Sequence, residues 1–185
     1  MITPGAAPAV IEGVRATRLW TVRRFSSDES AREFLCYAER FGNYKADRFL
    51  KPSQKLIVPH NLLLNEGITE ALLLITGGGA TPFSNGNARL GVGNGTAPAL
   101  PNQLGLQGAS KVYKTMEATY PQISGTTAVF RSVFGPSDAN FDWQEFSLCN
   151  GPDEALDENL NRRVQNAGTK ANGQTWTLDL SITLS

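Results

Sequence analysis

The sequence contains very little of the two residues that most often build reactive or metal-binding centres, histidine and cysteine. It has one histidine, His60, and two cysteines, Cys36 and Cys149, in 185 residues. Two isolated cysteines cannot make a disulfide framework, and their spacing matches no metal motif. We therefore expect two reduced, partly buried thiols, which fits assembly in a reducing cytoplasm.

Net charge, a leader sequence and a long apolar run are also missing. The 17 basic and 17 acidic residues cancel, and the pI is about 6.6, so no global positive field is present to hold nucleic acid. Residues 1–8 lack the charged and then apolar layout of a signal peptide. The run from Ala71 to Ile75 is far shorter than the roughly 20 residues that span a bilayer. We expect neither nucleic acid nor a membrane as a partner.

No residue pattern predicts catalysis or cofactor binding. His60 lies between Pro59 and Asn61, and nothing in its spacing assembles a hydrolase triad. The stretch Gly-Val-Gly-Asn-Gly-Thr at residues 91–96 misses the spacing of a dinucleotide loop, and no Gly-Lys-Ser or Gly-Lys-Thr follows it. We expect a tight surface turn there. The prediction is no catalytic residues, no cofactor and no metal ligands.

Acidic residues gather between positions 138 and 158, but in no metal-binding pattern. A calcium loop needs oxygen ligands at alternate positions and a glycine at its sharp turn. From Asp153, the first alternate position is Ala155, so the pattern fails. A solvated acidic rim, or a docking surface for a basic segment of a neighbour, is the simpler interpretation. A cation held by loop carboxylates is left open.

The C-terminal two thirds consist of strand-like runs separated by turns. Asn-Gly pairs are strong turn signals because both residues tolerate positive φ. They occur at residues 85–86, 94–95, 150–151 and 172–173. The predicted strands are residues 88–92, 111–120, 126–134, 141–148, 160–164 and 176–185. Apolar and polar residues alternate without a slip from Trp176 to Leu184, which predicts a half-buried strand in the sheet interior. The fold class is therefore mainly β with some α, an antiparallel β-sandwich or barrel.

The most apolar segment, residues 61–79, predicts one helix from about Leu62 to Thr76. Apolar residues recur on one side of it at Leu64, Ile68, Leu72 and Ile75. Further apolar residues widen this stripe over most of the circumference, and such a helix needs cover on nearly all sides. Gly67 costs about 1 kcal/mol relative to alanine, which suggests close approach of another backbone or a later start. We expect a core helix that packs against the β-unit.

The first 60 residues predict an N-terminal arm with a short amphipathic helix, attached to a β-rich core domain of residues 61–185. Residues 1–14 are rich in proline, glycine and alanine and predict a flexible or extended lead-in. Residues 16–25 predict a strand in which arginines interleave with aromatics. That composition is typical of an arm lying on a neighbouring subunit and also of a charged edge strand, and both remain open. The candidate partner-binding residues are Trp20, Arg23, Arg24 and Phe25.

The short amphipathic helix follows that strand. Ser26 and Glu29 have capping-box spacing, and Gly42-Asn43 ends the helical pattern. Residues 51–59 then predict an extended segment between prolines.

Residues 61–185 also carry a series of turn and strand motifs in a defined order. They are Asn61-Leu62-Leu63-Leu64 with Gly67-Ile68, residues 87–96, residues 138–146, Leu160-Asn161-Arg162, Gly168-Thr169-Lys170 and the closing strand from Trp176 to Ser185. Together they resemble a family of small virion structural proteins of tailed bacteriophages. The stretch 91–96 is also similar to domains that attach phage tail fibres. Residues 26–42 depart from the family, in which the lead-in is shorter.

The resemblance implies a non-enzymatic structural protein of the virion, assembled in the host cytoplasm. It would be a capsid decoration or minor capsid protein, with the major capsid protein or other virion proteins as partners, and a homo-oligomer. A tail or tail-fibre attachment protein is the first alternative. The second is a glycan-binding or hydrolytic module, which exposed tryptophans would favour, although Trp143 and Trp176 lie in predicted strands.

Overall fold

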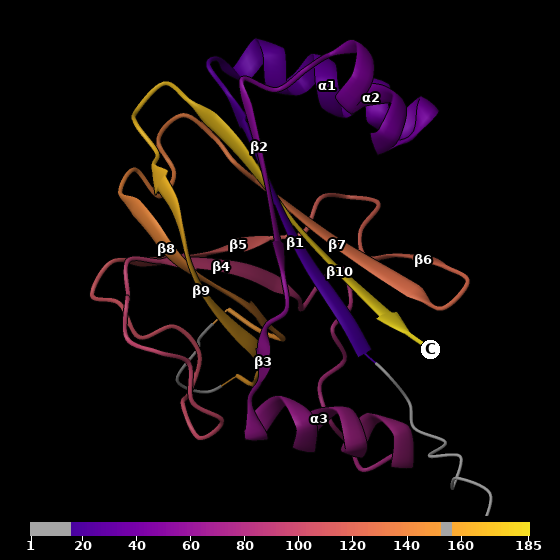
Figure 1. The fold of residues 1–185 in the computed structure, drawn as a ribbon. Coiled ribbons are helices and arrows are strands. Elements are labelled where there is room, and N and C mark those ends of the chain that lie inside the picture. Colours follow the sequence, from indigo (N-terminus) through magenta and orange to yellow (C-terminus); the bar gives the residue numbers. More distant parts are fainter. Residues whose placement is uncertain (1–15, 153–156) are drawn as a thin grey trace, which may run out of the picture.

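The computed structural model describes residues 16–152 and 157–185, which form two five-stranded antiparallel sheets and three helices. The sheets pack on each other around a shared apolar core, with helices at the two ends (Figure 1). The prediction of a mainly β, sandwich-like fold is confirmed. Residues 1–14, predicted as a lead-in, lie outside the described residues.

The first sheet joins the start of the chain to its end. Its strands, in spatial order, are β2 (Gln54–Pro59), β1 (Ala16–Phe25), β10 (Thr175–Leu184), β7 (Thr127–Phe134) and β6 (Gln122–Ser124). β1 pairs along its full length with β10, from Ala16 opposite Leu184 to Phe25 opposite Thr175, and its other side pairs with β2. Residues 16–25 are thus an inner strand, and both open interpretations, arm and edge strand, are wrong. The predicted boundary at residue 60 runs through one continuous sheet.

The second sheet is built from the middle of the chain. Its strands, in spatial order, are β3 (Leu62–Leu63), β9 (Asn159–Thr169), β8 (Asp142–Cys149), β4 (Arg89–Gly93) and β5 (Lys111–Thr115). β9 extends beyond the predicted run 160–164 because β8 supplies backbone partners along it, across two irregularities in register. The predicted strand 111–120 ends earlier, at Thr115.

Aromatic side chains fill the space between the sheets. The ring centroid of Trp143 on β8 lies 4.9 Å from that of Trp176 on β10 and 4.8 Å from that of Phe134 on β7. Leu178 and Leu180 are fully buried beside them. The alternation seen in the last strand therefore marks its core-facing side, and β10 lies in the sheet interior as predicted. The strand is not half-buried over residues 175–180, where both of its sides are covered.

The helices lie at opposite ends of the sandwich (Figure 1). α1 (Asp28–Phe41) and α2 (Asn43–Phe49) form a hairpin at one end, and α3 (Asn65–Thr76) lies at the other. The cap of α1 is Ser27, whose hydroxyl accepts from the Ser30 amide at 3.2 Å, one residue later than predicted. The sequence predicts a stop at Gly42, but this glycine, with φ of 85°, only turns the chain into α2.

Candidate functional site

The predicted partner-binding aromatics are buried inside the chain. Trp20 on β1 is fully buried, and its ring centroid lies 5.6 Å from that of Phe146. Phe25 is buried against Phe34 of α1, with ring centroids 5.1 Å apart. The assignment of Trp20 and Phe25 to partner contacts is wrong. Trp20 faces the core between the sheets, and Phe25, on the opposite side of β1, is covered by the α1–α2 hairpin.

The two predicted arginines are also engaged within the chain. Nε of Arg23 lies 2.7 Å from Oδ1 of Asp47, and its Nη1 lies 2.6 Å from Oδ2 of Asp179. Arg24 is half-buried, with its guanidinium carbon 4.5 Å from the ring centroid of Trp176, and burial lowers its pKa. Arg23 is therefore not an arm contact, and Arg24 is packed on the protein's own tryptophan.

A buried ion cluster fastens α2 to the first sheet. Asp179 on β10 accepts hydrogen bonds from Arg23 and from Arg131, the latter through Nε at 2.7 Å and Nη2 at 2.6 Å. Nη2 of Arg131 also donates to Oδ1 of Asn43 at 2.8 Å. Burial disfavours the charged form of Asp179, but the attraction and hydrogen bonds of the two arginines hold its pKa below the ordinary value. The hairpin is thus fixed on the sheet at α2.

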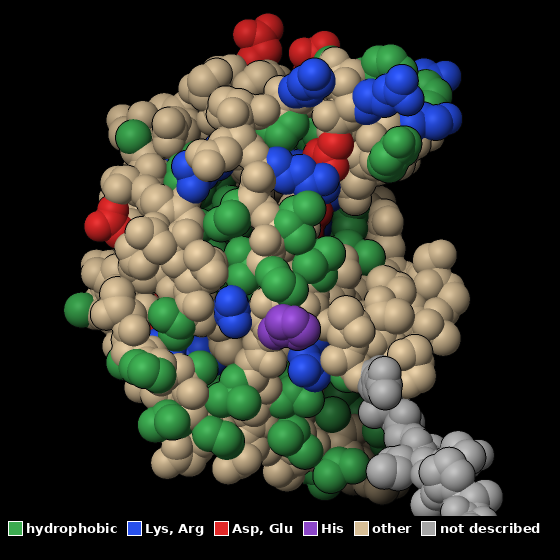
Figure 2. All heavy atoms as spheres, in the orientation of Figure 1, with side chains coloured by type: hydrophobic (Ala, Val, Ile, Leu, Met, Phe, Trp, Pro, Cys, Tyr) green, Lys and Arg blue, Asp and Glu red, His purple; other side chains and the backbone are tan. Residues whose placement is uncertain are grey.

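The outer end of the α1–α2 hairpin carries exposed aromatic rings framed by arginines, here named the aromatic patch. Its members are Arg40, Phe41, Tyr44, Arg48 and Phe49, together with the partly buried Tyr37, whose ring lies near those of Phe41 and Phe49. Tyr44 is 79% exposed and Phe49 is 63% exposed. The guanidinium carbon of Arg48 lies 5.9 Å from the ring centroid of Phe49. Hydrophobic and basic side chains stand together over this corner of the molecule (Figure 2). Aromatic residues and arginine are enriched at the centres of protein interfaces.

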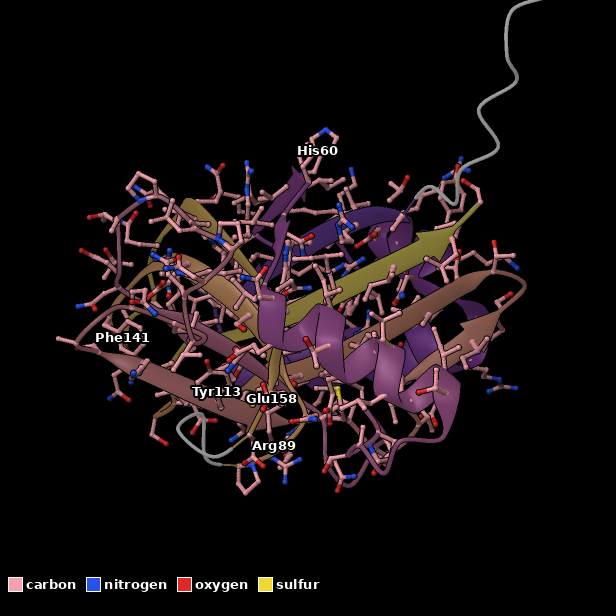
Figure 3. All side chains as sticks on the ribbon, turned by 90° about the horizontal axis from the view of Figure 1, so that it is seen from below. His60, Arg89, Tyr113, Phe141 and Glu158 are labelled. Atoms are coloured by element: carbon pink, nitrogen blue, oxygen red, sulfur yellow. The ribbon has the colours of Figure 1, made fainter. Side chains whose placement is uncertain are left out.

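Helix α3 is amphipathic, but its apolar side faces solvent and its polar side faces the protein, the reverse of the usual arrangement. Three aliphatic side chains at helical spacing, Ile68, Leu72 and Ile75, point outward and form what we call the α3 ridge. Leu72 is 57% exposed and Ile75 is 81% exposed, whereas Glu70 on the same helix is only 7% exposed. The prediction of a core helix covered on nearly all sides is wrong. Seen from below, α3 lies across the lower end of the sandwich (Figure 3).

Two contacts on the inner side of α3 set this orientation. Gly67 lies against β9, where a Cβ on it would be 2.3 Å from Cα of Leu160. Oε1 of Glu70 accepts hydrogen bonds from the Thr81 amide and from Nδ2 of Asn150, both at 2.7 Å. Since a glycine and a hydrogen-bonded carboxylate occupy the inner side, the ridge faces solvent.

An open apolar groove, here named the sheet-end groove, lies where β6 and β10 end and β7 begins. It has a volume of about 380 Å³. Its main lining residues are Ile123, Thr127, Ala128, Phe130, Ile182 and Leu184. Ile123 and Leu184 are both exposed at its margin.

The glycine-rich stretch 91–96 wraps one of the protein's own carboxylates. Oε1 of Glu145 accepts from the amides of Gly95 at 3.0 Å and Gly108 at 2.7 Å. Oε2 of Glu145 lies 2.6 Å from Nη2 of Arg162, and both side chains are fully buried. Amides satisfied in this way are not available to a phosphate. The predicted surface turn is in fact partly buried, since residues 91–93 lie inside β4.

The other residues weighed in the sequence are dispersed. His60 points away from the molecule (Figure 3). Nζ of Lys114 lies 2.5 Å from Oδ2 of Asp138, so this acid is paired within the chain. Among the described residues, no three histidine, cysteine or acidic side chains could together hold a metal ion. Asp153 and Glu154 lie outside the described residues. The acidic stretch is therefore not gathered into one site over the part described.

Exposed tryptophans, which would favour a glycan-binding module, are not present. Trp20, Trp143 and Trp176 are the three tryptophans of the sequence, and all are buried in the core. No helix in residues 16–152 or 157–185 is long and apolar enough to cross a membrane.

Comparisons with known proteins give no assignment: no family model, curated protein or solved structure matches this chain. The surfaces that the fold leaves exposed, together with the sequence motifs, are the basis for a functional proposal. They are the aromatic patch at one end, the α3 ridge at the other, and the sheet-end groove.

Proposed function

We propose that this protein is a non-enzymatic structural subunit of a tailed-phage virion, a decoration or minor capsid protein that docks on the assembled shell. The motifs in residues 61–185 that resemble small virion proteins give the biological setting. The observation that carries the docking is the aromatic patch on the α1–α2 hairpin.

The patch has the composition of an interface centre. Tyr44 and Phe49 expose large rings that bury well against a partner, and Arg40 and Arg48 lie beside aromatic rings. Residues of these types dominate the binding energy of protein interfaces, often at 2 kcal/mol or more for each central side chain. A monomeric surface rarely gathers such groups without a partner.

The partner surface is acidic, because the exposed charges of the patch are positive. Arg40, Lys45 and Arg48 are exposed at this end of the hairpin. Asp47 of α2 turns inward, where it pairs with Arg23 at 2.7 Å. Glu39 of α1 lines a separate hollow toward residues 117–122. We assign an acidic face of the major capsid protein, or of another shell protein, as the occupant.

The hairpin is also preorganised for docking. The Arg23–Asp179–Arg131 cluster holds α2 on the sheet, and Phe34 packs α1 on Phe25 of β1. Binding through a rigid surface loses little conformational entropy, and repetition over a symmetric shell multiplies modest single-site affinity.

The test is occupancy of purified particles by variants of the protein. We expect Tyr44→Ala/Phe49→Ala, and separately Arg40→Glu/Arg48→Glu, to lower the number of copies per particle about tenfold or more. Ile57→Ala is the matched control, because Ile57 is also an exposed large apolar residue but lies on β2. Quantitative mass spectrometry and imaging of the particles give the readout.

Location in the particle distinguishes the alternatives. Copy numbers comparable with the shell protein support the proposal, whereas a low copy number at the tail would assign the protein to tail or tail-fibre attachment. Unchanged occupancy by both double variants would show that the aromatic patch is not the docking surface.

A further inference from the structure

We propose that two copies of this chain associate about a twofold axis, with the α3 ridge of each copy seated in the sheet-end groove of the other. This self-association goes beyond the docking on a shell. It uses α3, which lies at the opposite end of the molecule from the α1–α2 hairpin, and the region around β6 and the C-terminal end of β10 (Figure 1). The contact between the ridge of one copy and the groove of the other would thus occur twice in the dimer.

The ridge presents no charge to a partner. Both acids of α3 turn inward: Glu70 is buried, and Oε1 of Glu66 accepts from the Asn159 amide at 3.0 Å. The two threonines on the outer side have hydroxyls that already donate to carbonyls of their own helix, Thr69 at 3.0 Å and Thr76 at 2.9 Å. What remains outward is aliphatic, and removing it from water is favourable at roughly 25 cal/mol per Å².

The groove has matching chemistry. The groove is lined by Ala128, Phe130, Ile182 and Leu184. The hydroxyl of Thr127, at its side, is hydrogen-bonded to the hydroxyl of Thr183 at 2.8 Å. Its volume of about 380 Å³ falls in the range of roughly 300–1,000 Å³ typical of binding pockets. A convex aliphatic ridge is therefore a suitable occupant, and a charged or strongly polar group is not.

The ridge cannot fill the groove of its own chain. Gly67 and Glu70 hold the inner side of α3 on β9, Thr81 and Asn150, so the ridge points outward. A second copy carries the same ridge and can approach the groove from outside, in whatever orientation the contact requires. Because neither surface carries charge, bringing two identical copies together creates no like-charge repulsion.

The position of the two surfaces selects the symmetry. α3 and the C-terminal end of β10, which carries Leu184, both lie in the lower half of the molecule, away from the α1–α2 hairpin (Figure 1). A twofold axis in that half buries the ridge and the groove of both copies in one isologous interface. A ring or filament would instead require the two surfaces to lie on different sides of the subunit.

The test uses complementary charges in the full-length chain, read out by sedimentation equilibrium. The unaltered protein is expected to form a concentration-dependent dimer. Ile75→Glu and Leu184→Lys, each alone, should weaken the dimer about a hundredfold or more, because every interface would bury two unpaired charges. Mixing these two variants should restore a heterodimer with one unaltered site and one Glu–Lys pair.

Two controls define the contact. A mixture of Ile75→Glu with Leu184→Glu also has one unaltered site but places two acids together in the other, so it should stay monomeric. Ile57→Glu adds the same charge at an isoleucine that is 51% exposed on β2, and it should remain dimeric. Circular dichroism of each variant verifies that the sandwich is folded.

Several results would overturn the proposal. A monomer at all concentrations would do so, as would a dimer that Ile75→Glu and Leu184→Lys leave intact. Residues 1–15 are the competing occupant, since they lead into Ala16, the register partner of Leu184. A chain that dimerises only after removal of residues 1–15 would assign the groove to that segment. If the protein were monomeric in solution but present on virions, the dimer proposal would be wrong and the virion role would stand. If it were dimeric but absent from virions, the virion role would be wrong and the dimer would stand.

Discussion

Gly67 of α3 lies directly on the backbone of Leu160 in β9, so closely that a Cβ on Gly67 would be 2.3 Å from Cα of Leu160. A Cβ essentially never approaches a non-bonded heavy atom within 3.0 Å, so only glycine fits at this position without a shift of the backbone. The first turns of α3 are therefore held on the second sheet by a residue without a side chain. That contact decides which side of α3 faces the protein and leaves Ile68, Leu72 and Ile75 on the other side.

Replacing Gly67 with alanine should destabilise the protein, although alanine favours helix by about 1 kcal/mol. The added methyl must displace the backbone of β9 or lift α3, and overpacking of this kind costs typically 1–3 kcal/mol or more. Chemical denaturation measures the change in free energy of unfolding. Gly86→Ala is the control, since a Cβ there meets nothing within 4 Å. A Gly67→Ala protein as stable as Gly86→Ala would contradict the close contact.

The sequence predicts the existence of α3, its approximate ends and the close approach at Gly67. It does not predict which side is buried. Hydrophobic periodicity assigns the aliphatic side to the core, because in a monomer that side is normally the inner one. Here Glu70 finds hydrogen-bond donors on two segments, Thr81 and Asn150, that lie 11 and 80 residues further along the chain. No local pattern in the sequence signals such partners.

The carboxylate of Glu70 should prove necessary as an acceptor. Glu70→Leu would leave the Thr81 amide without its acceptor and would leave Nδ2 of Asn150 with only the Thr81 carbonyl, at 3.0 Å. The lost hydrogen bonds should cost roughly 1–3 kcal/mol. Glu70→Gln keeps one acceptor oxygen and should lose less. Thermal unfolding of the two variants gives the comparison. A leucine variant at least as stable as the glutamine variant would mean that burial of apolar surface outweighs these hydrogen bonds.

The N-terminal strand shows the same limit. Its alternation is visible in the sequence, and its bounds at Ala16 and Phe25 are as predicted. Its arginines suggested an exposed basic arm because their counter-charges are remote: Asp179 is 156 residues from Arg23. Arg23 is the basic part of a buried ion cluster whose acidic partner, Asp179, comes close only when the chain folds.

Asp179 should make the protein sensitive to acid. Asp179→Asn leaves Arg23 and Arg131 buried with one carboxylate fewer, and breaking a buried pair costs about 3–5 kcal/mol at neutral pH. The folded-state pKa of Asp179 lies below the ordinary value of about 3.9. Its contribution is therefore complete above roughly pH 4 and is lost as the pH falls through the folded-state pKa. Denaturation at a series of pH values should show the stability difference between unaltered protein and variant shrinking at low pH. Asp142→Asn is the matched control at an exposed position. Asparagine keeps an oxygen that can accept from the Thr169 hydroxyl, so this change should alter the free energy of unfolding little.

The two cysteines should react very differently with an alkylating reagent. Cys36 is exposed on α1, whereas Cys149 is buried at the end of β8, where burial raises the pKa of its thiol to about 12. The thiolate is the reactive form, so Cys149 should stay unmodified at neutral pH while Cys36 is labelled. Intact-mass measurement should find one label on the native protein and two after denaturation. Rapid double labelling of the native protein would place Cys149 outside the core.

Truncation separates the N-terminal segment from the fold. Removing residues 1–25 deletes β1, which pairs with both β10 and β2 and carries the buried Trp20, so the chain should fail to fold. Removing residues 1–15 leaves intact every strand pair that the first sheet forms within residues 16–152 and 157–185. This shorter deletion should therefore keep the circular dichroism spectrum and cooperative unfolding of the full chain. Loss of particle binding by the longer deletion alone is therefore no evidence for an arm. If removal of residues 1–15 abolished particle binding by a folded protein, the contact with the shell would lie in that segment and not in the aromatic patch.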